Sequence, residues 1–194
     1  MAPAAITECT FDQNTAAGEG GAVTIINFSQ AAGRDFVPTA SSCTFTGNSC
    51  GLGAGLDVVM GNGNVVVSDC SFVRDAADGN AGGFLGIDTT STRCTFIGNT
   101  SGGFGGGGEF GACTVSNSHF EQNLAREGGG LWSCGLVTGS TFVGNSATRA
   151  GGGRLHRLPA TIRNCTFFAN SAPMGSGVGS VPSPVENENG VTSG

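Results

Sequence analysis

The chain lacks tyrosine and lysine and is poor in charge of either sign. All eight of its basic residues are arginine, and Asp, Glu, Lys and Arg together make up 11% of the 194 residues. The formal net charge is −6, whereas a nucleic-acid-binding surface is normally basic. We therefore expect no nucleic-acid partner.

Long apolar runs and short cysteine pairs are also missing. No apolar stretch reaches the roughly 18 residues of a spanning helix, so we expect no direct membrane insertion. The first residues, "MAPAAITECTF", show no basic region of a signal peptide. No CxxC pair occurs, which argues against zinc, and we expect neither a metal nor a cofactor. We interpret the chain as part of a longer extracellular or cell-surface protein.

Glycine, phenylalanine and cysteine are abundant instead. The 36 glycines disfavour long helices, while 13 phenylalanines and eight cysteines supply enough apolar surface to bury. They recur in one phrase, for example "CTFIGNTSGGFGGGG" from Cys94. Seven copies are marked by Phe11, Phe45, Phe72, Phe96, Phe120, Phe142 and Phe167, at spacings of 34, 27, 24, 24, 22 and 25 residues.

A period near 24 residues with strand-like alternation predicts a β-solenoid. We expect an all-β, single-stranded, right-handed parallel β-helix of about seven coils over residues 1–181. A loop insertion is expected near 27–40, and residues 182–194 read as a flexible polar tail or linker. Alternation places Val66, Cys70 and Phe72 on the inner face and Asp69 and Ser71 on the outer one.

Stacked coils place equivalent residues above one another, about 4.8 Å apart. The phenylalanines, including Phe45, Phe72, Phe96, Phe120 and Phe142, should then form an internal aromatic ladder. The residue three positions later is Asn14, Asn48, Asp75, Asn99, Asn123, Asn145 or Asn170. An asparagine there tolerates a left-handed backbone, and its amide can bond to the neighbouring coil.

This pattern resembles the repeats of the chlamydial polymorphic outer membrane proteins, defined by FxxN and GGA[ILV]. FxxN occurs in six of the seven copies, and GGA-aliphatic is strict at residues 20–23. The resemblance implies a right-handed parallel β-helix of the kind found in the passenger domains of adhesins.

Seven of the eight cysteines fall into two groups. Five of the eight lie two residues before a marker phenylalanine, where Cys serves as a small internal hydrophobe. Cys113 and Cys134 are 21 residues apart, about one coil, and form the best candidate disulfide.

Basic residues gather late in the chain and suggest a ligand-binding surface. If they point outward, Arg154 and His156 share a strand face, with Arg157 close by and Trp132 in the preceding coil as a stacking platform. Such a group could hold an acidic sugar or a partner carboxylate, although a solvated charged face is the simpler interpretation.

Two other functions share this architecture. A pectin lyase-like polysaccharide lyase or hydrolase would need clustered carboxylates, but Asp57, Asp69, Asp75, Asp78 and Asp88 fall in different columns. An ice-binding protein would present a double row of threonines. One outward row exists, from Thr10 to Thr166, but its neighbouring outward column, from Glu8 to Asn164, is charged and irregular.

We therefore assign no catalytic residues. The sequence predicts a non-catalytic structural or adhesive solenoid that meets protein or glycan partners through its lateral faces or coil ends. Its first coil starts without a preceding amphipathic cap. We therefore expect its N-terminal edge to meet either another chain, as in end-to-end self-association, or a missing upstream segment.

Overall fold

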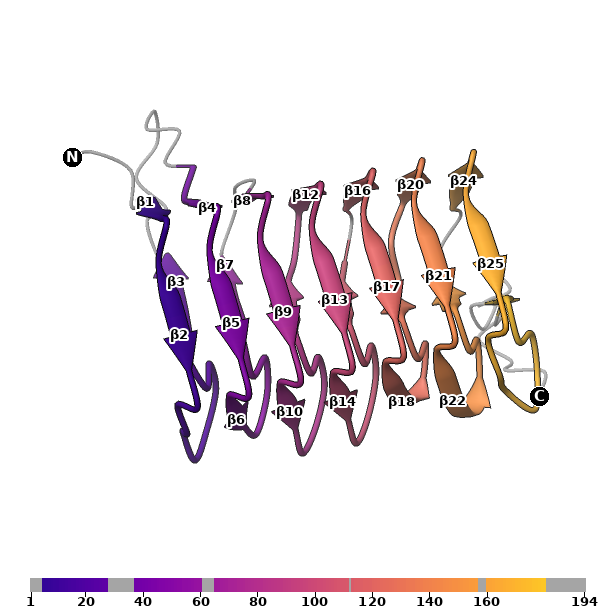
Figure 1. Ribbon diagram of the computed structural model, residues 1–194, viewed down its shortest axis with the longest axis horizontal. Coiled ribbons are helices and arrows are strands. Elements are labelled where there is room, and N and C mark those ends of the chain that lie inside the picture. The colour runs from indigo at the N-terminus through magenta and orange to yellow at the C-terminus, as the bar shows by residue number, and fades with distance from the viewer. Residues whose placement is uncertain (1–4, 28–36, 61–64, 112, 157–159, 181–194) are drawn as a thin grey trace, which may run out of the picture.

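A computed structural model describes residues 5–27, 37–60, 65–111, 113–156 and 160–180. Every strand pair that it contains is parallel, and successive coils advance along one axis from the N-terminal to the C-terminal end (Figure 1). The predicted all-β parallel solenoid is confirmed. The predicted tail at 182–194 and residues 28–36 of the predicted insertion lie outside the described residues.

Four sheets run along the rod, and three of them have seven strands. Sheet A consists of β1 (Ala5–Thr7), β4 (Thr39–Ser41), β8 (Val65–Ser68), β12 (Thr89–Thr92), β16 (Thr114–Ser116), β20 (Leu136–Thr138) and β24 (Thr161–Arg163). Sheet B consists of β2 (Thr10–Asp12), β5 (Thr44–Thr46), β9 (Ser71–Val73), β13 (Thr95–Ile97), β17 (His119–Glu121), β21 (Thr141–Val143) and β25 (Thr166–Phe168).

The other two sheets complete each coil. Sheet C has five strands: β6 (Ser49–Cys50), β10 (Ala76–Ala77), β14 (Thr100–Ser101), β18 (Leu124–Glu127) and β22 (Ser146–Ala150). Sheet D consists of β3 (Val23–Asn27), β7 (Leu56–Met60), β11 (Phe84–Gly86), β15 (Gly108–Phe110), β19 (Leu131–Trp132), β23 (Arg154–His156) and β26 (Val178–Ser180). The chain passes through A, B, C and D in order and returns to A one coil further on.

The marker phenylalanines form one continuous stack in the core. Neighbouring ring centroids from Phe11 to Phe167 are 4.6 to 5.0 Å apart, and the rings are within 9° of parallel. The five inner rings are fully buried. Burying a side chain of this size contributes roughly 1.5–3 kcal/mol relative to exposure. The stack is therefore the main apolar support of the rod.

A second ladder of asparagines runs beside the phenylalanines. Each asparagine forms one rung of this ladder, and a rung is regular where asparagine is followed by asparagine in the next coil. In a regular rung, the backbone N–H and the Nδ2 donate to Oδ1 of the next asparagine, as from Asn99 to Asn123 at 2.9 and 3.0 Å. The same Nδ2 also donates to the carbonyl of a phenylalanine in the preceding coil, Phe72 in the case of Asn99. These bonds satisfy polar groups that are completely buried.

The corner between sheets A and B changes the expected alternation. Asp69 has a φ of 56°, and the residues at equivalent positions in the other coils also have φ between 50° and 56°. This left-handed residue turns the chain and resets the period of two. Val65 and Val67 are therefore buried and Val66 points outward, so the prediction that Val66 faces the core is wrong.

Candidate functional site

The outer face of sheet A is rich in hydroxyl groups. Each strand contributes two outward residues, and in register they form two columns. From β4 to β20 these residues are Thr39 and Ser41, Val66 and Ser68, Thr90 and Thr92, Thr114 and Ser116, and Leu136 and Thr138. None of them is charged. Ser116 donates to the Thr92 hydroxyl at 3.0 Å, so the hydroxyls are also ordered between coils.

Sheet B carries the threonine row that the sequence indicated. Thr10, Thr44, Ser71, Thr95, His119, Thr141 and Thr166 stack in register on its outer face. The second outward column of this sheet is mixed, with Val73, Ile97 and Glu121 among its members. The column from Glu8 to Asn164, which the sequence suggested as the neighbour of the threonine row, lies instead at the left-handed corner between sheets A and B. Two adjacent columns of mostly hydroxyl-bearing residues, absent from sheet B, lie instead on sheet A.

One exposed ion pair marks that corner. Arg93 donates through Nε and Nη2 to the two carboxylate oxygens of Asp69, at 2.7 and 2.8 Å. The Arg93 guanidinium lowers the pKa of Asp69. Both side chains are largely exposed, so the pair stabilises the fold only slightly. The pair does show that oppositely charged side chains in adjacent coils can reach each other.

The Gly-rich segment between sheets C and D packs over the outer face of sheet D. Trp132 stacks on Phe104 with ring centroids 4.8 Å apart, and the Arg126 guanidinium lies 5.4 Å from the centre of the Phe104 ring. Gly128 has a φ of 65°, and a Cβ there would lie 2.9 Å from the Cβ of Trp132. Trp132 therefore serves packing at this corner, with part of its surface exposed.

The predicted ligand-binding group is not assembled on the surface. Arg154 and His156 share a face of β23, as predicted, but that face points inward, and Arg154 is fully buried. Arg154 occupies the inner column beside Leu131, and its guanidinium donates to the Cys134 carbonyl. His156 is partly exposed, and its pKa is lowered, first by burial. Arg157 lies outside the described residues.

We expect replacement of Arg154 with methionine to leave the protein at least as stable as the wild type. Burial lowers the Arg154 pKa to about 10, and its Nε and Nη1 have no hydrogen-bond partner among the described residues. Replacing a buried charge with an apolar side chain of similar size is often neutral or stabilising by about 1–4 kcal/mol. Urea denaturation measures the change. The exposed Arg163→Met is the control, and a marked loss of stability in Arg154→Met alone would contradict the expectation.

A disulfide joins two coils near the corner between sheets D and A. Cys113 and Cys134, the pair singled out in the sequence, are bonded with an S–S distance of 2.00 Å and Cα atoms 5.0 Å apart. The other six cysteines are free thiols. Cys43, Cys70 and Cys94 are buried in the internal column, where they pack as small apolar side chains.

The five aspartates considered for an enzyme differ in their surroundings. Asp57 and Asp75 are buried, and burial raises the pKa of each to about 7. Asp69, Asp78 and Asp88 are exposed. Within the described ranges, no three His, Cys, Asp or Glu side chains come close enough together to hold a metal ion.

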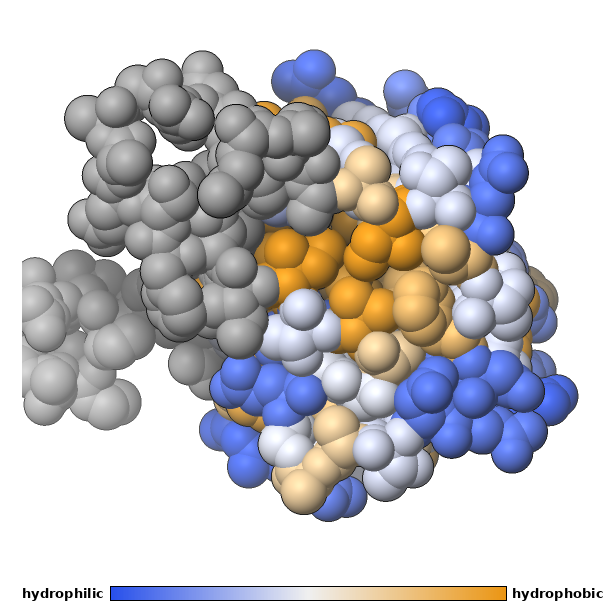
Figure 2. Space-filling model, turned by 90° about the vertical axis from the view of Figure 1, so that its left-hand side faces the viewer, coloured by the Kyte–Doolittle hydropathy of each residue, from blue (hydrophilic) through white to orange (hydrophobic). Residues whose placement is uncertain are grey.

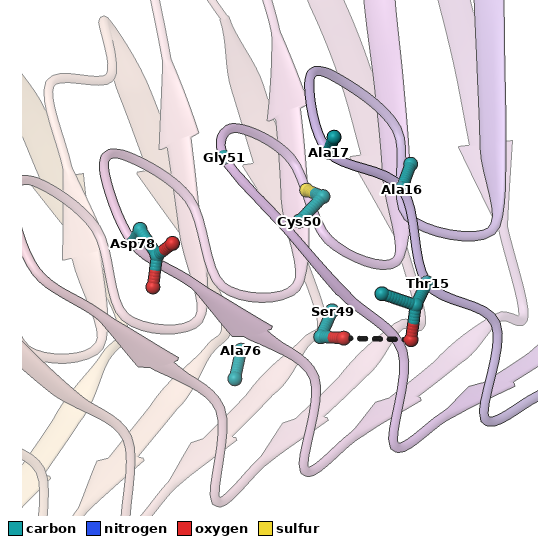
Figure 3. A pocket seen from close by; sticks show the side chains of 8 residues that line it. All are labelled: Thr15, Ala16, Ala17, Ser49, Cys50, Gly51, Ala76 and Asp78. Atoms are coloured by element: carbon teal, nitrogen blue, oxygen red, sulfur yellow. Dashed lines mark hydrogen bonds between the residues drawn. The ribbon is translucent and has the colours of Figure 1, made fainter.

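A shallow pocket on the sheet C side of the first three coils was not anticipated (Figure 3). Its volume is about 250 Å³, and Thr15, Ser49, Cys50 and Asp78 supply its polar lining. The Thr15 and Ser49 hydroxyls are hydrogen-bonded to each other at 3.0 Å. Small residues make up the rest of the lining, and no sequence motif marked them. One carboxylate beside two paired hydroxyls does not form a catalytic arrangement.

These features define a parallel β-solenoid built from stacked internal ladders, with columns of outward side chains on its sheets. Residues 8–25 match the model of the Chlamydia polymorphic membrane protein repeat, which agrees with the resemblance drawn from FxxN and GGAV. Neither the curated proteins nor the solved structures yielded a match to the chain. The described residues form no helix long and apolar enough to cross a membrane.

Proposed function

We propose that this chain is a non-catalytic structural or adhesive segment of a larger surface or extracellular protein, and that sheet A is its recognition face. Solenoids present extended surfaces to their partners. The observation that carries the proposal is the double column of uncharged, mostly hydroxyl-bearing side chains from Thr39 to Thr138. The matched repeat comes from a membrane-protein family, which supports a surface location.

A glycan is the partner that this face suits best. Serine and threonine hydroxyls both donate and accept hydrogen bonds, as sugar hydroxyls do. Val66 and Leu136 lie in the same columns as these hydroxyl groups and add apolar contact area. The face has no charged residue from β4 to β20, so we propose a neutral rather than an acidic glycan.

Thr114→Arg is expected to weaken binding to an array of immobilised neutral oligosaccharides by about tenfold or more, because it places an unpaired charge in the middle of the face. The matched control is Thr100→Arg, which adds the same charge on the exposed side of sheet C. Glycan-array binding of both variants and the wild type measures the effect. Equal binding by all three would reject sheet A as the recognition face.

Sheet A also supports a second candidate function, ice binding. Its two mostly hydroxyl-bearing columns lie in register, whereas the threonine row of sheet B has no such second column. A thermal hysteresis measurement on the purified chain tests this candidate, and an absence of hysteresis rejects it. A polysaccharide lyase or hydrolase would instead show depolymerisation of an acidic polysaccharide in the same preparation.

A further inference from the structure

Among the described strands, three sheets have an unpaired edge at each end of the rod. β1, β2 and β3 each form one edge of their sheet, and β24, β25 and β26 form the opposite edges. No described strand pairs with the outer side of any of these six. Unpaired strand edges readily pair with another chain.

The N-terminal end exposes the apolar core in cross-section. Figure 2 looks onto this end and shows a hydrophobic centre within a more polar rim. Ile6, Cys9, Phe11 and Val23 belong to the core cluster there but are only partly buried. In the last coil, Cys165 and Phe167 occupy the positions that Cys9 and Phe11 have in the first, and they too are only partly buried. The aromatic stack therefore ends in a partly exposed ring on each side.

The asparagine ladder gives the two ends complementary hydrogen-bonding groups. In the interior, each regular rung donates through its backbone N–H and Nδ2 to Oδ1 of the following rung. Asn170 is the last rung, and its backbone N–H meets no acceptor among the described residues. Asn14 is the first rung, and its Oδ1 is free of any donor in the same set. A donor at one end thus matches an acceptor at the other.

A second hydrogen bond fits the same arrangement. The Nδ2 of Asn48 donates to the carbonyl of Phe11 in the coil before it. If the last coil of another copy preceded the first coil, the Nδ2 of Asn14 would in the same way donate to the Phe167 carbonyl of that copy.

Charge also differs between the two end coils. The described residues 5–27 contain Glu8, Asp12 and Glu19 and no basic residue, a formal charge of −3. Residues 160–180 contain Arg163 and no acidic residue, a formal charge of +1. If the coils continue in register, Arg163 lies one column from Glu8. The Arg93–Asp69 pair already bridges two coils in the interior at the adjacent corner.

We propose that the chain associates head to tail, with the C-terminal end of one copy seated on the N-terminal end of a second copy. Parallel pairing would continue through β24 with β1, β25 with β2, and β26 with β3. Each of these pairs joins three-residue strands, except that β3 has five residues. Such a contact is heterologous and does not close, so it produces filaments of increasing length.

Sedimentation velocity of the 194-residue chain over a concentration series tests the proposal. We expect species that grow with concentration beyond a dimer and shorten at high salt. A monomer at every concentration, as would result if another segment of the chain covered either end, overturns the proposal. So does growth that stops at a dimer.

A charge swap then tests which surfaces meet. Arg163→Glu places a negative charge one column from Glu8, in an end coil with a formal charge of −3, and we expect the association constant to fall by about tenfold or more. Glu8→Arg in the same chain is expected to restore most of it. Arg74→Glu, which alters an exposed arginine on the side of the rod, is the control and leaves assembly unchanged. A double variant that assembles no better than Arg163→Glu overturns the head-to-tail contact.

Discussion

Replacing Asp75 with asparagine is expected to make the solenoid more stable at pH 8 and to flatten its dependence on pH. Asp75 stands where every other rung has asparagine, and it accepts from the backbone N–H and Nδ2 of Asn48, both at 2.8 Å. Its backbone N–H donates to Asn99 Oδ1 at 2.9 Å. Its Oδ2, however, is buried without a partner, because a carboxylate cannot donate as an Nδ2 does.

The direction of the pH effect follows from the raised pKa. Burial raises the pKa of Asp75 from 3.8 to about 7, so the folded state holds a proton that the unfolded chain releases at lower pH. Its favourable contribution is complete below about pH 4 and is lost as the pH rises to about 7. The loss is on the order of 4 kcal/mol. Asparagine carries no titrating proton and restores the donor.

Urea denaturation of the wild type and Asp75→Asn between pH 4 and pH 8 measures the difference. Asp57 and Glu109 also have pKa values raised to about 7 by burial, but both proteins contain them, so their effects cancel in the comparison. Asn123→Asp is the matched reverse change in an all-asparagine part of the ladder. It should acquire the pH dependence that Asp75→Asn loses. Parallel stability curves for wild type and Asp75→Asn would contradict the expectation.

Phe96→Ala is expected to destabilise the protein by about 3–5 kcal/mol, which is the usual cost of truncating a buried phenylalanine. Phe96 is fully buried, and its ring lies 4.9 Å from that of Phe72 and 4.6 Å from that of Phe120. Each coil of a solenoid is stabilised mainly by its neighbours. A cavity in the middle rung therefore weakens the coupling between the two halves of the rod.

Circular dichroism during urea denaturation measures this loss, and a second transition would show that the two halves unfold separately. Phe168→Ala removes a ring of the same size that is 67% exposed on the outer face, and it should change stability by less than about 0.5 kcal/mol. Similar losses in the two variants would mean that the aromatic stack is not the main support of the fold.

The sequence predicted the fold because its ladders depend on residue type and spacing alone. The phenylalanine and asparagine columns repeat once per coil, so their stacking could be read directly from Phe45, Phe72, Phe96 and their equivalents. The orientation of individual side chains was harder to predict. The left-handed residue at Asp69 resets the alternation, and this moved Val66 outward and left the hydroxyl array of sheet A unnoticed.

The inward placement of Arg154 had no sequence signal. Its position in β23 belongs to the inner column, but an arginine there contradicts the usual exclusion of charge from a core. The partial closure of sheet D by the Gly-rich corner was also unpredictable, since it depends on tight contacts such as that of Gly128 with Trp132. Spacing could indicate which residues stack but not what covers them.

Differences in coil length are confined to one connection, the passage from sheet D to sheet A. It extends from Asn27 to Thr39 after the first coil but only from Trp132 to Leu136 after the fifth, whereas the path from each phenylalanine to sheet D hardly varies. Peptides grafted at this passage should therefore be accommodated without disturbing the stacked rungs. The same tolerance would let gene duplication and insertion diversify one edge of the rod while its interior remains conserved in form.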